Sequence, residues 1–196
     1  MMATPAQGRD FLTIVSGLPR SGTSLMMRML DVGGLPVLVD NVREADVDNP
    51  RGYYEYEPVK QTKADPSWVA PATGKVVKMV YLLLLDLPPG REYRVVFMRR
   101  NIDEVLASQK AMLDRLGKSS PLDDAKMAAL FRDQLAKFDA WIADRPHFRR
   151  LDVSHNALVT DPAPLAAEVD RFLGGGLDVE AMSRVIDPSL YRNRSV

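Results

Sequence analysis

A loop rich in glycine and hydroxyl side chains follows the first apolar run of the sequence, residues 11–16. Residues 17–24 read GLPRSGTS and lead directly into a helical pattern. The backbone amides of such a loop and of the first helical turn point toward one anion, and the hydroxyls of Thr23 and Ser24 add donors. Arg20 supplies a fixed positive charge with several N–H groups. The order of strand, glycine loop and helix predicts a phosphate site, whereas the alternative is a turn that only caps a core helix.

The residue types in this loop argue against the common magnesium–nucleotide site. P-loop enzymes that hydrolyse ATP or GTP carry a lysine on the terminal phosphates, and Thr23 occupies that position here. The apolar run at residues 93–98 ends in Arg99 and Arg100, where many such enzymes have an acidic residue that helps to hold magnesium. We therefore expect a nucleotide whose phosphates are neutralised by side chains, and we expect no metal.

The loop resembles that of the sulfotransferase superfamily, whose members use 3′-phosphoadenosine 5′-phosphosulfate (PAPS). Those enzymes carry Pro-(Lys/Arg)-Ser-Gly-Thr-(Ser/Thr) after the first strand. Residues 19–24 read PRSGTS, which is most similar to the arginine version in tyrosylprotein and small bacterial sulfotransferases. The resemblance implies that the loop holds the 5′-phosphosulfate end of PAPS. The residues implied for this role are Pro19, Arg20, Ser21, Gly22, Thr23 and Ser24.

A second element of the same family is an arginine at a strand end, followed eight residues later by a helical serine. Arg100 and Ser108 have this spacing, although Ile102 replaces the proline that the family has between them. The resemblance implies that both residues contact the 3′-phosphate of the nucleotide; the alternative is a solvated arginine and an ordinary helix serine. The C-terminal nucleotide segment of cytosolic sulfotransferases is absent. Arg192 and Arg194 are candidates to replace it, unless they belong to a frayed basic tail.

Sulfuryl transfer needs a cation near the leaving phosphate and a base near the acceptor hydroxyl. Arg20 fits the first role. Lys78 matches the lysine of the Lys-Thr-His segment in cytosolic sulfotransferases, and the alternative is a surface lysine with a buried aliphatic stem. The histidine of that segment falls at Val80, so the usual base is missing. We expect His147 to be a solvated turn residue, and His155 aligns with a different family segment.

A carboxylate is therefore the expected base, as in tyrosylprotein sulfotransferases. Residues 48–57 resemble an Asn-Pro-x-Gly-x-x-Glu element of bacterial family members. Glu55 is the first candidate, Glu57 the second and Asp40 the third. The alternative is that Glu55 is a capping or salt-bridged residue of a short helix.

The elements around these residues predict an α/β fold. Apolar runs of strand length alternate with patterns of helical period, which indicates β-α-β units and a mostly parallel sheet with helices on both faces. We predict a three-layer α/β/α domain of the P-loop nucleotide-binding type with five strands. The expected strands are residues 11–16, 35–39, 75–80, 93–98 and 148–153. The expected helices are residues 24–32, 102–116, 123–143 and 164–173, and the expected loops are residues 40–52 and 64–74.

Length and composition limit the number of domains and the classes of function that this sequence allows. The 196 residues contain 26 lysines and arginines against 26 aspartates and glutamates, and no cysteine. This length suits one domain over residues 1–196, with residues 1–10 as a loose lead-in. Balanced charge gives no general attraction to nucleic acid, and the lack of cysteine excludes disulfides and thiolate chemistry. No apolar run approaches the roughly twenty residues that span a bilayer, and no signal peptide is visible, so we expect a cytoplasmic protein.

Taken together, the motifs predict a PAPS-dependent sulfotransferase that acts on a hydroxyl or amine of a small-molecule, carbohydrate or peptide acceptor. Two alternatives have different chemistry. One is a catalytically silent module that binds the nucleotide, and the other is a small P-loop kinase.

Overall fold

A parallel β-sheet organises the protein. The computed structural model describes residues 8–40, 42, 52–120 and 122–186. Four parallel strands form the sheet in the order β2-β1-β3-β4. They are β1 (Leu12–Gly17), β2 (Val76–Lys78), β3 (Tyr93–Arg99) and β4 (Phe148–Ser154). The chain passes from β2 at the edge to β3 on the other side of β1, so the carboxyl ends of β1 and β3 meet where the winding reverses.

The prediction of a fifth strand at residues 35–39 is wrong. This segment makes only an isolated bridge between Val37 and Val76. Leu38 donates its N–H to the carbonyl of Val76 over 2.8 Å, and Val76 donates to the carbonyl of Pro36 over 2.9 Å. Pro36 has no N–H of its own, and β2 offers only three residues as a partner, so the ladder stops after one bridge.

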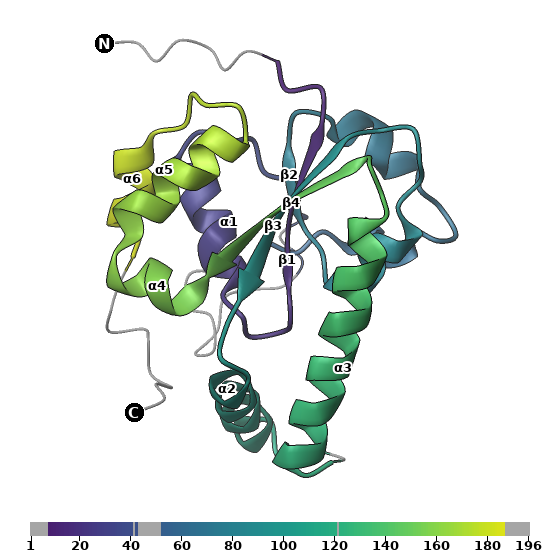
Figure 1. Cartoon of the computed structure of the whole chain (residues 1–196), viewed down its shortest axis with the longest axis vertical. Helices are drawn as coiled ribbons and strands as arrows, with labels where there is room; N and C mark the ends of the chain where they lie inside the picture. Colours follow the sequence, from purple (N-terminus) through teal and green to yellow (C-terminus); the bar gives the residue numbers. More distant parts are fainter. Residues whose placement is uncertain (1–7, 41, 43–51, 121, 187–196) are drawn as a thin grey trace.

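Helical segments cover both faces of the sheet, as the three-layer prediction requires (Figure 1). One face carries α1 (Thr23–Val32), α4 (His155–Thr160), α5 (Pro162–Phe172) and α6 (Val179–Arg184). The other face carries α3 (Asp124–Ala143) and three 3₁₀ segments, η1 (Glu57–Gln61), η2 (Ser67–Ala72) and η3 (Tyr81–Asp86). Strands β1, β2 and β3 are therefore largely buried, whereas Arg149 and Asp152 of the edge strand β4 stay exposed.

Two apolar cores explain why β1 and β2 are mostly apolar. Neighbouring residues of a strand point to opposite faces, so Val15 packs with the α1 core whereas Ile14 packs with the η-segment core. Val76 and Val77 divide in the same way. All four side chains are fully buried. A strand with both faces covered has no position left for an exposed polar residue.

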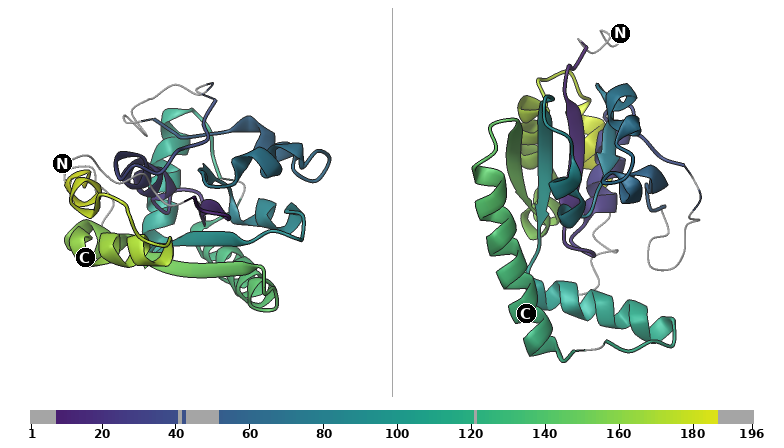
Figure 2. Two further views of the ribbon diagram at one scale, coloured as in Figure 1. Left: turned by 90° about the horizontal axis from the view of Figure 1, so that it is seen from above. Right: turned by 90° about the vertical axis from the view of Figure 1, so that its right-hand side faces the viewer.

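The helix α2 (Ile102–Arg115) and the first half of α3 extend beyond the carboxyl ends of the strands (Figures 1 and 2). A small cluster of Leu106, Met127 and Ala128 joins the two helices. Asn101 caps α2 by accepting a hydrogen bond from the N–H of Asp103 over 2.8 Å. Because α2 begins only three residues after the last residue of β3, Ser108 on its second turn stays close to the sheet edge.

The predicted helices agree with the structure to within two residues at each end. Two helices of six residues, α4 and α6, had no counterpart among the predictions because six residues show too little of a helical period. The predicted loop at residues 64–74 contains η2. Near the N-terminus, Arg9 donates to the carbonyls of Leu173 and Gly175 over 2.9 and 2.8 Å, which ties the chain to the end of α5. Within the described ranges, no helix is both long and apolar enough to cross a membrane.

Candidate functional site

The phosphate loop connects β1 to α1 at the carboxyl edge of the sheet. Gly22 ends the loop in a left-handed conformation with φ 98°, and Arg20 also has a positive φ of 69°. Gly17 lies so close to β3 that an added Cβ would be 2.7 Å from the carbonyl oxygen of Met98. Glycine is therefore required at both ends of the loop, once for backbone conformation and once for space.

The N-terminus of α1 has the features of an anion site. Its capping residue is Gly22, which has no side chain to accept from the first amides, and the first turn contains no acidic residue. Ser21 is 1% exposed, and its Oγ has no hydrogen-bond partner among the described residues. Buried hydroxyls without a partner are uncommon in folded proteins. The loop therefore fits an oxyanion.

The second sequence element lies against this loop. Arg20 donates its Nε–H to Ser108 Oγ over 3.1 Å, and Arg100 donates from Nη1 to the carbonyl oxygen of Arg20 over 3.0 Å. The pairing of Gly17 with Met98 in the parallel sheet brings the two chain segments together. The structure thus gathers the predicted residues Arg20, Arg100 and Ser108 at one point.

Arg99 ends β3 and Arg100 follows it, and the two side chains have different surroundings. Arg99 pairs with Asp139 of α3 over 2.5 Å and with Asp152 of β4 over 3.4 Å. Arg100 instead turns toward the phosphate loop, because successive residues at a strand end point to opposite sides. Of the pair, only Arg100 belongs to the site.

Three residues that the sequence analysis did not place in the site surround Arg100. Glu104 Oε2 accepts from the Nε–H of Arg100 over 3.1 Å, and Asn156 donates from Nδ2 to Glu104 Oε1 over 3.0 Å. His155 packs against the loop, since a Cβ on Gly22 would be 2.4 Å from its Cδ2. Burial, reinforced by the positive charge of Arg100, lowers the pKa of His155 to about 4. The i,i+4 spacing of Arg100 and Glu104 was the one available signal for this pair.

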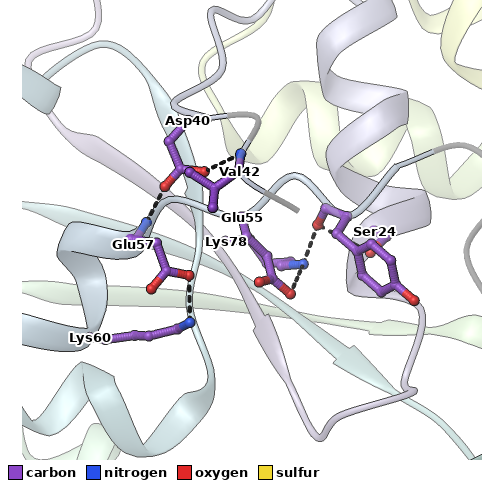
Figure 3. A network of polar contacts seen from close by, with 8 residues as sticks. Ser24, Asp40, Val42, Glu55, Glu57, Lys60 and Lys78 are labelled. Atoms are coloured by element: carbon purple, nitrogen blue, oxygen red, sulfur yellow. Dashed lines mark hydrogen bonds and ion pairs between the residues drawn. The ribbon is translucent and has the colours of Figure 1, made fainter. Parts of the chain in front are cut away.

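Lys78 and Glu55 lie near Ser24 (Figure 3), on the β2 side of β1 and thus opposite to the β3 side that carries Arg100. Lys78 ends β2 beside Val15, and its Nζ donates to the carbonyl of Tyr53 and lies 3.8 Å from Glu55 Oε1. Ser24 Oγ donates to the same carbonyl over 3.4 Å. The side chains of Lys78 and Glu55 are 15% and 23% exposed, so both are largely shielded from solvent. The structure therefore brings the predicted lysine and the first-choice carboxylate together, next to Ser24.

The other two candidate carboxylates have different surroundings. Asp40 Oδ2 accepts from the N–H of Glu57 over 2.5 Å, and Oδ1 accepts from the N–H of Val42 over 3.1 Å. These hydrogen bonds lower the pKa of Asp40. Glu57 pairs with Lys60 over 2.5 Å on the exposed surface of η1. Figure 3 shows both carboxylates in a cluster separate from Glu55 and Lys78.

Two solved structures share this architecture. The sulfotransferase domain of the olefin synthase from Synechococcus PCC 7002 has a TM-score of 0.55 at 16% identity, over 100% of this chain and 92% of that one. A sulfotransferase domain from the curacin biosynthetic pathway has a TM-score of 0.53 at 14% identity, over 94% of this chain and 90% of that one. The chain has a sulfotransferase-type fold. No family model and no curated protein sequence matches it.

Within this sulfotransferase-type fold, the remaining predicted residues take ordinary positions. Pro19 is exposed in the loop, and Thr23 begins α1 with a half-buried side chain. Arg192 and Arg194 lie outside the described residues. Across the described part of the chain, no three acidic or histidine side chains gather as they would around a metal ion.

Proposed function

We propose that this protein is an enzyme that transfers a sulfonate group from PAPS to a hydroxyl or amine of a small-molecule, carbohydrate or peptide acceptor. The observation that supports this most is the contact of the phosphate loop with Arg100 and Ser108. In the family that the sequence resembles, these two elements bind opposite ends of the same nucleotide. Their meeting in a sulfotransferase-type fold favours one continuous nucleotide site.

The donor-binding roles follow from charge and position. The uncapped amides of α1, with Ser21, Thr23 and Ser24, would hold the 5′-phosphosulfate end. Arg100 and Ser108 would hold the 3′-phosphate, where the planar guanidinium suits two phosphate oxygens at once. Side chains and helix amides thus supply the positive charge that a nucleotide with three anionic groups requires.

The transfer step would use Glu55 and Lys78, which lie on the β2 side of β1. The acceptor oxygen forms a bond to sulfur while the bond from sulfur to the bridging phosphate oxygen breaks, and adenosine 3′,5′-bisphosphate leaves with the electron pair. The proton of the acceptor hydroxyl passes to the Glu55 carboxylate. Lys78, whose Nζ lies 3.8 Å from Glu55 Oε1, would offset the charge of the transferred sulfonate. Arg20 would stabilise the charge that develops on the leaving phosphate.

Two measurements test the proposal. The first compares thermal unfolding with adenosine 3′,5′-bisphosphate and with Mg-ATP, because a ligand at one hundred times its Kd stabilises the folded state by about 2.7 kcal/mol. The second follows transfer of radiolabelled sulfate from PAPS to a panel of hydroxyl and amine acceptors, with and without EDTA. We expect stabilisation by the bisphosphate and sulfate transfer that EDTA does not reduce.

Other outcomes point to the alternatives. Stabilisation by Mg-ATP alone, with an activity that EDTA removes and magnesium restores, would indicate a P-loop kinase. Tight binding of the bisphosphate without transfer to any acceptor of the panel would indicate a silent binding module.

A further inference from the structure

Glu104 is the most deeply buried carboxylate next to the nucleotide site. Its side chain is 2% exposed, and both of its oxygens accept hydrogen bonds, one from Arg100 and one from Asn156. We infer that Glu104 is a positioning residue that orients Arg100 toward the 3′-phosphate and thereby sets the preference for a 3′-phosphorylated nucleotide. This inference rests on the proposed function.

The guanidinium of Arg100 is held from two directions. Glu104 accepts from its Nε over 3.1 Å, and the carbonyl of Arg20 accepts from its Nη1 over 3.0 Å. A planar group with two edges held in place can present its remaining N–H donors in only one orientation. Recognition of two phosphate oxygens by arginine depends on this orientation, because the donors form a rigid fork.

Glu104 is itself held by a different element of the fold. Asn156 lies on α4, whereas Glu104 lies in the first turn of α2 and Arg100 lies two residues before that helix. His155, the neighbour of Asn156, packs against Gly22 of the phosphate loop. The Glu104–Asn156 contact therefore fixes the position of α2 relative to the loop.

Stability alone is a weak explanation for this buried ion pair. A buried pair loses the hydration of both charges, and apolar residues of similar size often replace such pairs without loss of stability. A carboxylate close to a phosphate site also reduces the local positive potential, which by itself would weaken anion binding. The benefit that offsets this electrostatic cost is the orientation of Arg100.

The test is a comparison of two nucleotides that differ only in the 3′-phosphate. Isothermal titration calorimetry would give the Kd of adenosine 3′,5′-bisphosphate and of adenosine 5′-monophosphate for the wild type, Glu104→Gln and Asn156→Ala. Glutamine keeps the size of Glu104 but can accept through only one oxygen. Asp103→Asn, which changes an exposed carboxylate in the same helical turn, is the matched control.

We expect Glu104→Gln to weaken binding of the bisphosphate about tenfold and binding of the monophosphate less than about twofold, as for other residues that orient a ligand-binding side chain. Asn156→Ala should raise the ratio of the Kd of the bisphosphate to the Kd of the monophosphate by a smaller factor. If Glu104→Gln does not fold, Asn156→Ala tests the inference alone. Asp103→Asn should keep the wild-type ratio.

Two results would overturn the inference. An equal loss for both nucleotides would show a merely structural role, and tighter binding of the bisphosphate would show that Glu104 opposes the phosphate instead of orienting Arg100. A different result addresses the proposed function: a wild type that binds both nucleotides equally well has no 3′-phosphate contact, which removes that site and the role of Glu104 with it.

Discussion

The guanidinium Nε of Arg20 lies 3.1 Å from the hydroxyl oxygen of Ser108, although 88 residues separate the two along the chain. Arg20 belongs to the loop after β1, and Ser108 lies on the second turn of the helix after β3. The contact joins the phosphate loop to α2. It also places the Arg20 guanidinium beside Ser108, one of the two residues proposed for the 3′-phosphate.

Replacing Arg100 with alanine should weaken nucleotide binding. On the proposed function, the variant would lose a charge-assisted contact to a phosphate that does not react, so the KM for PAPS should rise with a smaller change in kcat. We expect a loss of about 2 kcal/mol, or roughly 30-fold, in the affinity for adenosine 3′,5′-bisphosphate. Arg99→Ala is the matched control, since that side chain pairs with Asp139 and Asp152. An Arg100→Ala protein with unchanged affinity would contradict the 3′-phosphate assignment.

Replacing Arg20 with alanine distinguishes two roles for its positive charge, one at the leaving phosphate and one at the 3′-phosphate. If Arg20 stabilises the leaving phosphate, charge develops there only as the bond breaks, and kcat should fall about 10²- to 10³-fold. Ser108→Ala should instead raise the KM for PAPS with kcat nearly unchanged. Should Arg20→Ala also change only KM, Arg20 acts together with Ser108 on the 3′-phosphate and not on the leaving group.

Replacing Glu55 with glutamine should remove general-base catalysis. Glutamine keeps the shape of the side chain but cannot take the acceptor proton, so kcat should fall by about 10²- to 10⁴-fold while the Kd for the nucleotide stays nearly constant. Glu57→Gln is the control, because Glu57 faces Lys60 on the surface. Asp40→Asn should mainly lower the thermal stability, because Asp40 holds backbone amides. If Glu55→Gln turns over normally, acceptor activation lies elsewhere.

Replacing Gly22 with alanine should disrupt the phosphate loop. The new Cβ would lie 2.4 Å from Cδ2 of His155, and alanine would also have to adopt a φ of 98°. Gly34→Ala is a matched control because Gly34 has a similar φ of 91° but no heavy atom within 4 Å of the added Cβ. The control should cost about 1 kcal/mol in the free energy of unfolding, and Gly22→Ala distinctly more, with weaker nucleotide binding. Equal melting temperatures would show that His155 does not confine the loop.

The free energy of unfolding should decrease at acidic pH because of His155. Burial, with a further contribution from Arg100, lowers its pKa in the folded state to about 4, against about 6.5 in the unfolded chain. Between these values the unfolded state binds the additional proton, so the free energy of unfolding decreases by up to about 3 kcal/mol as the pH falls from 6.5 to 4. Denaturant unfolding at several pH values measures the slope. His155→Gln should flatten this slope.

Local patterns in the sequence determined much of the fold. The apolar runs with β-strand length and the helical periods of residues 24–32 and 123–143 follow from short-range chemistry, so they predicted strands and helices close to those observed. The phosphate loop was visible for the same reason, since its glycines and hydroxyls are consecutive. The prediction of a fifth strand was wrong because a strand needs a partner to pair with. Strand β2 has only three residues, and Pro36 has no N–H to donate to it.

Only the tertiary structure decided which distant residues meet. The sequence ranked Glu55, Glu57 and Asp40 by resemblance alone. In the fold, Lys78 lies beside Glu55, whereas Glu57 pairs with Lys60 on η1 and Asp40 accepts from the N–H of Glu57. Glu104 and Asn156 lie 52 residues apart, and no local pattern connects an asparagine of a six-residue helix to a buried carboxylate. Strand order and register bring such residues together, and these are properties of the whole sheet rather than of any one segment.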